Sequence, residues 1–296
     1  MASFTQRFSR QLAVPLAMTI LVFTSGFSPF ESLFAPSSNL IPRWADFSAE
    51  STQAVNQDEW NGFIRKYREE SFDGIARIAY HRVNLDDHLA LKEHLEYLQS
   101  IKVSNLNRDQ QLAYWINLYN AATVNLILEH MPLESIRDIN ISPGLFASGP
   151  WGKKLLRIEG EKVSLNDIEH GILRPGWKDP RIHYVLNCAS LGCPDLPNEA
   201  ITATEFDTQL TVAAQRFIDH PRAVNIGENN EAVVSSIYVW FKDDFGGSDA
   251  SVLDHLRTYA SKERQKELMK IRSIENHTYN WNLNSVPIVA TASTGS

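Results

Sequence analysis

Both cysteines of the chain lie in one short stretch, Asn187-Cys-Ala-Ser-Leu-Gly-Cys-Pro194. Two histidines, His170 and His183, lie close upstream of it. A thiolate is a strong nucleophile, and thiols also form disulfides and bind metal ions. Two cysteines placed together beside histidines therefore predict nucleophilic catalysis, a disulfide or a metal site.

Cys188 is the stronger candidate for a nucleophile. It follows an apolar run and precedes small residues that allow a tight turn. Backbone N–H groups in such a turn, near Ala189 and Ser190, can stabilise an oxyanion. Cys193 is followed by Pro194, which removes one backbone donor and stiffens the loop.

A catalytic thiol needs a base, and two histidines compete for that role. His170 belongs to a predicted helix and can approach Cys188 in space, as catalytic partners usually do. Consecutive helical residues diverge, so Glu169 is expected to contact another part of the site or to bond a neighbouring group. His183 lies on a predicted strand and meets Cys188 only if that strand ends before the cysteine. Either histidine can instead be an ordinary structural group.

The cysteine pair has two further interpretations. Four residues separate the thiols, so a disulfide would stabilise the fold by about 2 kcal/mol in the loop-entropy treatment, and it could switch the thiol reversibly. A zinc site would take four ligands from Cys188, Cys193, His170 and His183. The spacing of the cysteines is wide for zinc and the histidines are not paired, so we expect no bound metal.

A long helix, about Asn107 to His130, is predicted at the centre of the core. It carries no charged residue between Gln110 and Leu128. Its asparagines argue against a membrane span, because buried amides cost free energy unless they are hydrogen-bonded. Asn117 and Asn120 share a face of this helix, where they either bond neighbouring backbone or orient a catalytic group.

Shorter elements are predicted around this helix. Further helices are expected from near Ser48 to Tyr67, after Asn84, from Ser164 until Pro175 and Gly176 end it, from Thr202 to Ile218, and from Ser251 to Met269. Strands are expected at Leu155–Ile158 with Val163, at Ile182–Leu186, at Val224–Ile226 with Val233–Val234, and within Ile271–Leu283. Helices outnumber short strands, which predicts a single α+β domain with a helical N-terminal part packed on a small mixed or antiparallel sheet.

The composition and the absence of known nucleotide motifs exclude some classes of function. The chain has a net charge of −7 and no basic run, so a nucleic-acid partner is not expected. No nucleotide loop or flavin fingerprint is present, so we expect no cofactor. At 43% hydrophobic residues, the chain can bury a sizeable core.

The N-terminus has the features of an export signal. Arg7 and Arg10 precede the apolar stretch Leu12–Phe23, and small residues follow. This stretch is short for a membrane span, which needs about twenty residues. We predict a signal peptide or anchor at 1–26, a linker at 27–47, the domain at 48–285 and a tail at 286–296. The protein is then periplasmic or secreted, and it contacts a membrane only through an uncleaved anchor.

Several motifs are similar to those of the domain-of-unknown-function family 547 (DUF547). They are Tyr114–Asn120, Ile168–Arg174, Arg181–Pro194, Ser235–Ile237 through Phe245–Gly246, and Tyr279–Asn284. The resemblance spans roughly residues 50 to 285, and three ordered motifs make it specific. Members occur in plants and among exported bacterial proteins, and the chain resembles the bacterial members.

The resemblance implies a shared site of Asn117, Asn120, Glu169, His170 and Cys188. Plant-type members often carry serine at the position of Cys193, which weakens an obligatory disulfide or zinc site. Cys188 with His170 is then the more transferable pair. The family's activity is not settled, so the resemblance implies a site without a reaction.

The sequence favours an exported thiol-dependent hydrolase or acyl transferase. Cys188 would attack a carbonyl, His170 would act as base and then acid, and Glu169 or an asparagine would orient it. The substrate is expected to be a small molecule or a peptide. The alternatives are a non-catalytic binding or scaffold module with a buried polar network, and a redox or zinc-stabilised module.

Overall fold

Helix α3, Arg108–His130, forms the middle of the larger hydrophobic core. The computed structural model describes residues 37–144, 149–227 and 229–288. Asn107 and Gln110 cap the helix reciprocally: Asn107 Oδ1 accepts from Gln110 N–H at 2.9 Å, and Gln110 Oε1 accepts from Asn107 N–H at 3.0 Å. Nearly every side chain from Gln111 to Ile127 is buried. The predicted central helix is confirmed.

Two helices precede α3 and pack beside it. They are α1, Asp58–Tyr67, and α2, Leu85–Ser100. Asn84 caps α2 by accepting from a first-turn N–H at 2.8 Å, as its position before the helix predicts. Helix α2 contacts α3, and α1 contacts α2. The helix expected to start near Ser48 begins only at α1, so the prediction is wrong for residues 48–57, which form no helix.

Short strands form three small sheets in the described part of the chain. The strands are β1 (Arg68–Glu70), β2 (Ala76–Ile78), β3 (Lys154–Ile158), β4 (Glu161–Ser164), β5 (Val224–Ile226), β6 (Glu231–Ser235) and β7 (Ser273–Thr278). The pairs β1–β2, β3–β4 and β5–β6 are antiparallel, whereas β7 runs parallel to β6. The predicted α+β class, with small mixed and antiparallel sheets, is confirmed.

The two predicted hairpins are present as β3–β4 and β5–β6. In the first, Glu159 and Gly160 join the strands with left-handed φ angles of 46° and 86°. Two consecutive positive φ angles give the turn twist that matches paired strands. The strand predicted within Ile271–Leu283 is β7, and it pairs with β6 at the edge of the three-stranded β5–β6–β7 sheet.

Smaller helices make up the second half of the chain. They are α4 (Arg174–Trp177), α5 (Phe206–Asp219), α6 (Ile237–Trp240), α7 (Asp249–Tyr259) and α8 (Lys262–Leu268). The stretch Ser251–Met269 was expected as one helix, but it splits at Ala260, whose ψ of 154° is extended. Ser261 then caps α8 through its hydroxyl. The continuous helix is therefore wrong, because a serine cap restarts it.

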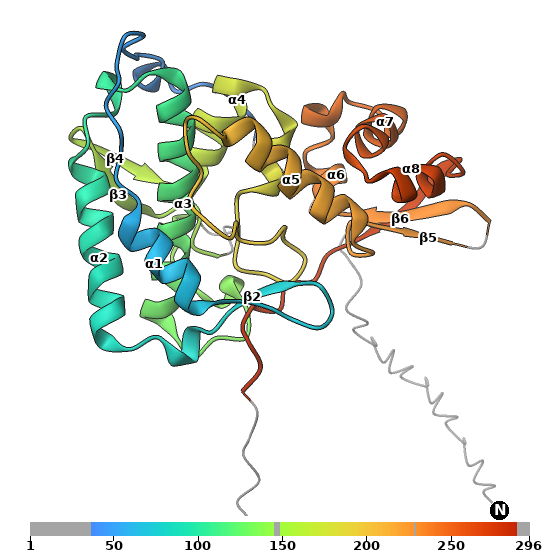
Figure 1. The fold of residues 1–296 in the computed structure, drawn as a ribbon, viewed down its shortest axis with the longest axis horizontal. Coiled ribbons are helices and arrows are strands. Elements are labelled where there is room, and N and C mark those ends of the chain that lie inside the picture. Colours follow the sequence, from blue (N-terminus) through green and yellow to red (C-terminus); the bar gives the residue numbers. More distant parts are fainter. Residues whose placement is uncertain (1–36, 145–148, 228, 289–296) are drawn as a thin grey trace, which may run out of the picture.

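Two hydrophobic cores lie side by side (Figure 1). The larger holds α1, α2, α3 and the β3–β4 hairpin, and the smaller lies among α5 to α8 and the β5–β6–β7 sheet. The segment that leads to the cysteines contributes to both: Ile182 and Val185 pack into the larger core and Tyr184 into the smaller. This segment therefore runs along the junction of the two cores.

The buried strand expected at Ile182–Leu186 is wrong. Residues Pro180–Tyr184 form a 3₁₀ helix, η7, and the chain continues irregularly to the cysteines. Asp179 starts the helix by accepting from Arg181 N–H at 2.9 Å, and Pro180 supplies the φ of a first helical turn. A short apolar run is compatible with either structure, and this cap decides between them.

The helix expected to start at Ser164 is present but continues differently. Ser164 N–H donates to Asp167 Oδ2 at 2.7 Å, and Asp167 N–H donates to Ser164 Oγ at 3.2 Å, so the predicted capping box is confirmed. Asp167–Leu173 is a π-helix, η6, and α4 follows without a break. Pro175 and Gly176 lie inside α4, so the expected end there is wrong: proline fits the first turn of α4.

The predicted signal or anchor, residues 1–26, lies outside the described residues. Part of the predicted linker packs on the domain: Asn39 N–H donates to His170 O at 3.2 Å, and Ile41 N–H donates to Gly171 O at 2.8 Å. The rings of Trp44 and Trp115 pack edge to face, with their centroids 5.2 Å apart. Among the described residues, no helix is long and apolar enough to cross a membrane.

Candidate functional site

Cys188 and Cys193 lie together in the loop between η7 and α5 (Phe206–Asp219). Their Sγ atoms are 2.8 Å apart, and both are free thiols. Cys188 is partly exposed, whereas Cys193 is only 3% exposed. Cys193 Sγ also accepts from Cys188 N–H at 3.0 Å. The two thiols thus share one site but differ in access to solvent.

Tyr279 and Ser190 complete the surroundings of Cys188. Tyr279 Oη lies 2.9 Å from Cys188 Sγ and 2.8 Å from Ser190 Oγ. Ser190 Oγ lies 3.5 Å from the same sulfur. Tyr279 follows β7 directly, so the parallel strand of the β5–β6–β7 sheet brings this hydroxyl to the cysteine loop.

These contacts favour a thiolate at Cys188. The hydrogen bond between the two sulfurs holds the pKa of Cys188 below its ordinary value, although burial acts to raise it. Ser190 and Tyr279 lower the pKa of Cys188 further, and the negative charge of Glu169 raises it. Burial and then the hydrogen bond to Cys188 raise the pKa of Cys193 well above its ordinary value. Cys188 therefore ionises first.

Asn187 closes the cysteine loop. Its Oδ1 accepts from Ala189 N–H at 2.9 Å, and its Nδ2 donates to Pro194 O at 2.9 Å. One buried side chain thus ties the two ends of the loop together. Ala189 itself has a left-handed φ of 57°, which turns the chain sharply after Cys188.

The segment after β7 pairs with this loop. Leu191 N–H donates to Asn282 O at 2.8 Å, and Gly192 N–H donates to Asn280 O at 2.8 Å. Ser190 is 1% exposed, yet no described residue accepts a hydrogen bond from its backbone N–H. Buried backbone donors without an acceptor are rare. This N–H, two residues after Cys188, has no acceptor among the described residues.

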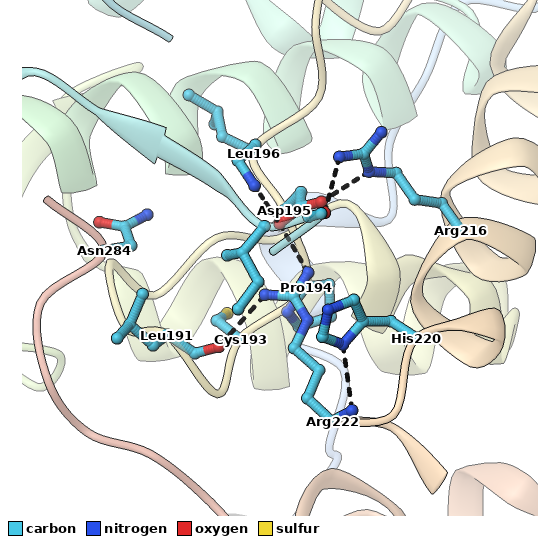
Figure 2. A network of polar contacts seen from close by, with 12 residues as sticks. Leu191, Cys193, Pro194, Asp195, Leu196, Arg216, His220, Arg222 and Asn284 are labelled. Carbon is cyan, nitrogen blue, oxygen red and sulfur yellow. Dashed lines mark hydrogen bonds and ion pairs between the residues drawn. The ribbon is translucent and has the colours of Figure 1, made fainter. Parts of the chain in front are cut away.

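Asp195 fixes the far end of the loop (Figure 2). Its carboxylate is 6% exposed and accepts from Arg216 Nε and Arg222 Nη2, each at 2.6 Å. Ala76 N–H of β2 also donates to Asp195, at 3.1 Å. Arg222 reaches back to the loop and donates to Leu191 O at 3.2 Å. Arginines and a strand edge thus hold the loop from its C-terminal side.

Asn117 and Asn120 both clamp backbone from helix α3. Asn117 Nδ2 donates to Ile201 O at 2.8 Å, and Asn117 Oδ1 accepts from Ile201 N–H at 2.9 Å. Asn120 Nδ2 donates to Val185 O at 2.8 Å, and Asn120 Oδ1 accepts from Asn187 N–H at 2.9 Å. Asn117 thus holds a segment after the loop, whereas Asn120 holds the residues that lead to Cys188.

A second cluster contains both histidines. Arg174 Nη1 donates to His170 Nδ1 at 3.1 Å, and Arg174 Nε donates to Asp244 Oδ2 at 2.6 Å. His183 Nε2 lies 2.7 Å from the same Asp244 oxygen, and its ring stacks on Phe241 with centroids 4.4 Å apart. The hydrogen bonds from His183 and Arg174 outweigh burial and hold the pKa of Asp244 well below its usual range.

These partners fix which nitrogen of each ring can accept a proton. His170 Nδ1 accepts from Arg174, so a neutral His170 carries its proton on Nε2. His183 donates Nε2–H to Asp244, which leaves the Nδ1 lone pair of a neutral His183 as an acceptor. Burial lowers the pKa of His170, with the charge of Arg174 acting in the same direction and Glu169 opposing it.

Glu169 lies close to both histidines. Its Oε1 is 3.8 Å from His170 Nδ1 and 3.9 Å from His183 Nδ1. The buried Tyr119 hydroxyl donates to Glu169 Oε2 at 3.2 Å. Glu169 thus bonds a neighbouring group, Tyr119, and lies near both histidines from the π-helix η6.

The structure does not join Cys188 to either histidine by a hydrogen bond within the described residues. The charge of Glu169 acts on the pKa of both Cys188 and His170. Nor do the described histidine, cysteine and acidic side chains form any group of three or more suited to a metal ion. The four proposed zinc ligands therefore do not converge.

A comparison with family models covers the loop and both asparagines. Residues 103–218 match the family described as "Protein of unknown function, DUF547". These residues are a DUF547 domain. Searches of curated proteins and of solved structures found no match. The DUF547 domain contains every candidate residue named from the sequence: Asn117, Asn120, Glu169, His170, His183, Cys188 and Cys193.

Residues beyond the DUF547 domain complete the site. Tyr279, Asp244 and Arg222 all follow residue 218 and contact the domain's cysteine loop or its histidines. Sequence reasoning missed these three residues as parts of the site. Tyr279 begins one of the motifs that carry the family resemblance, and this was the available signal for it.

Proposed function

We propose that the chain is a thiol-dependent hydrolase or acyl transferase with Cys188 as its nucleophile. The observation that carries the proposal is a partly exposed cysteine, Cys188, whose sulfur has Cys193 Sγ at 2.8 Å and Tyr279 Oη at 2.9 Å. Donors at these positions stabilise the thiolate, which is the reactive form of a cysteine.

The unpaired Ser190 N–H supports acyl chemistry in particular. Attack of a thiolate on a carbonyl places negative charge on the carbonyl oxygen, and a preorganised backbone donor stabilises that charge. Ser190 N–H is buried and free of any described acceptor. Ala189 N–H is not available, because it already donates to Asn187 Oδ1. The oxyanion therefore takes its hydrogen bond from Ser190.

The reaction proceeds through a thioester on Cys188. The thiolate attacks the carbonyl carbon and the bond to the leaving group breaks, the leaving group taking a proton from solvent. Water or an acceptor nucleophile then attacks the thioester, gives its proton to a base and releases the acyl group with the Cys188 thiolate. A base is needed for this second step. His183 suits it better than His170, since Asp244 fixes the His183 proton on Nε2 and leaves Nδ1 to accept. Glu169 lies at 3.9 Å from that nitrogen.

Acylation by a generic activated ester tests the nucleophile without knowledge of the substrate. The reduced protein is mixed with p-nitrophenyl acetate, released nitrophenol is followed, and peptide mass spectrometry locates the acetyl group. We expect stoichiometric acetylation of Cys188, and its loss in Cys188→Ala. Acetylation that is spread over lysines at the same rate in wild type and Cys188→Ala would overturn the proposal.

The two histidines are separated in the same assay. His183→Gln should leave the first acetylation intact and slow release of the acetyl group, because release needs the base. His170→Gln should change release less. A slower release in His170→Gln than in His183→Gln would return the base to His170, the residue favoured by the sequence.

The non-catalytic alternative has one observation in its favour. Asn117 holds Ile201 through both side-chain atoms and touches no candidate catalytic group, as a scaffold residue would. This alternative gives no role to the thiolate donors around Cys188 or to the unpaired Ser190 N–H. It predicts that Cys188→Ala preserves partner binding, whereas disruption of Asn117 lowers thermal stability.

A further inference from the structure

The two thiols form an ordered pair rather than two equivalent groups. Cys188 is partly exposed and its sulfur contacts the Tyr279 hydroxyl at 2.9 Å. Cys193 is buried, and its sulfur lies 3.4 Å from Leu186 O and accepts from Cys188 N–H. An external reagent therefore reaches Cys188 first, and Cys193 sits behind it at 2.8 Å.

The loop is already shaped for a bond between the sulfurs. A disulfide requires an S–S distance of about 2.0 Å, which is less than 1 Å shorter than the 2.8 Å of the free thiols. Asn187 ties the loop ends at Ala189 and Pro194, and Asp195 is held by two arginines (Figure 2). None of these contacts uses a cysteine sulfur, so they persist when the sulfurs bond.

We propose that Cys188 and Cys193 form a reversible dithiol–disulfide couple that exchanges with low-molecular-weight disulfides, in which Cys188 attacks and Cys193 resolves. The couple uses the same Cys188 thiolate as the proposed acyl transfer but needs no acyl chemistry. It gives this site a second activity, the reduction of small disulfides or, in the reverse direction, the oxidation of small thiols.

The exchange balances in two steps. The Cys188 thiolate attacks one sulfur of the small disulfide, its S–S bond breaks, and one small thiolate leaves. The Cys193 sulfur then attacks Cys188 in the mixed disulfide, the second small thiolate leaves, and it takes the Cys193 proton. Two protein thiols are oxidised to one disulfide, and one small disulfide is reduced to two thiols.

The electrostatics of the pair set this order. The pKa of Cys188 is lowered by its hydrogen bond to Cys193, and burial raises the pKa of Cys193. Cys188 is therefore the thiolate that starts the exchange. Once it carries the small thiol, Cys193 is the nearest nucleophile, and Cys188 N–H remains at 3.0 Å to stabilise its developing thiolate.

Redox titration of the full chain tests the proposal directly. The protein is equilibrated in buffers of reduced and oxidised glutathione, quenched with acid, and its free thiols are alkylated and located by mass spectrometry. We expect wild type to pass from two free thiols to an internal Cys188–Cys193 disulfide that excess reduced glutathione reverses. Accumulation of glutathione on Cys188 of wild type without the internal bond would overturn the proposal.

Two matched variants establish the order of the thiols. Cys193→Ser should trap glutathione on Cys188. Cys188→Ser should react with oxidised glutathione at least about tenfold more slowly than Cys193→Ser, because its remaining thiol is buried. Equal rates in the two variants would contradict the assigned roles. Near-ultraviolet circular dichroism checks that both variants fold, and the wild-type titration stands without them.

The result of the redox titration is independent of the result of the ester assay. Reduced wild type that is acetylated on Cys188 but never forms the internal disulfide overturns the redox couple alone. Reversible disulfide formation without acetylation overturns the acyl-transfer function alone. Where both hold, oxidation should abolish acetylation and reduction should restore it, because the disulfide removes the Cys188 thiolate.

Discussion

Asn120 accepts a hydrogen bond from the backbone N–H of Asn187 at 2.9 Å, so the central helix holds the residue that directly precedes Cys188. Its amide also donates to Val185 O, two residues earlier. Asn187 in turn ties Ala189 to Pro194. The most buried helix of the fold thus sets the position of the cysteine loop through two asparagine side chains.

Asn120→Ala and Asn117→Ala should separate stability from reactivity. Each variant leaves a buried backbone N–H and C=O without partners, so each should lower the free energy of unfolding by about 3 kcal/mol in urea denaturation. Only Asn120→Ala should change the rate at which iodoacetamide alkylates Cys188, because Asn117 holds Ile201 instead. A change of the same size in both variants would contradict a specific role for Asn120.

Tyr279→Phe should raise the pKa of Cys188. The variant removes an O–H donor at 2.9 Å from the sulfur but keeps the ring that packs against Trp240 and Trp281 at 4.9 Å and 4.6 Å. The pH profile of Cys188 alkylation should move to higher pH, with a several-fold slower rate near neutrality. Tyr97→Phe, at an exposed site on α2 (Leu85–Ser100), is the control that should leave the profile unchanged. An unshifted pH profile in Tyr279→Phe would show that the Tyr279 hydroxyl does not stabilise the Cys188 thiolate.

The sequence predicts the helices best where a cap and an apolar stripe agree. Asn84 and Asn107 each precede a helix that the structure contains, and both side chains cap it. Ile182–Leu186 shows the opposite case, because a run with four hydrophobic residues out of five suits a buried strand and a 3₁₀ turn equally. There the Asp179–Pro180 cap carried the deciding information.

The candidate site was predictable in part for a similar reason. Cys188, Cys193 and the histidines are close in sequence, so their types and spacing are visible together. Tyr279 is 91 residues from Cys188, and Asp244 is 61 residues from His183. Only the parallel placement of β7 (Ser273–Thr278) beside β6 (Glu231–Ser235) and the packing of the second core bring such residues in. No local pattern encodes these contacts.

Acid should destabilise the fold through His94. Burial lowers the pKa of His94 from 6.5 to about 4, and its ring is 4% exposed. As the pH falls below about 6.5, His94 is protonated in the unfolded chain, but in the folded protein it stays neutral until about pH 4. The free energy of unfolding therefore falls across this window by up to about 3 kcal/mol. Above about pH 6.5, His94 is neutral in both states and does not change the free energy of unfolding.

His94→Gln should flatten that dependence, measured as the free energy of unfolding in urea at several pH values between about 4 and 7. The substitution removes the titrating ring while keeping a polar group opposite Gln57, which lies 3.2 Å from His94 Nε2. His81→Gln, at an exposed position, should leave the slope unchanged. Equal slopes in wild type and His94→Gln would show that other groups carry the acid sensitivity.

Gly192 should tolerate no side chain, because the segment after β7 lies directly on it. A Cβ there would stand 2.6 Å from Asn280 N and 2.9 Å from Tyr279 Cγ, and the first of these is backbone. Gly192→Ala should therefore force the Asn280 segment away, lower the free energy of unfolding by about 1–3 kcal/mol and slow Cys188 alkylation through the displaced Tyr279.

Gly62→Ala is the matched control for this substitution. Gly62 lies inside α1 (Asp58–Tyr67), and a Cβ there meets nothing within 4 Å. It should raise the free energy of unfolding by about 0.5–1 kcal/mol, since alanine costs less backbone entropy in a helix, and leave alkylation unchanged. If Gly192→Ala gave the same results as Gly62→Ala in both measurements, the close contact at Gly192 would not be needed to position the Tyr279 hydroxyl beside Cys188.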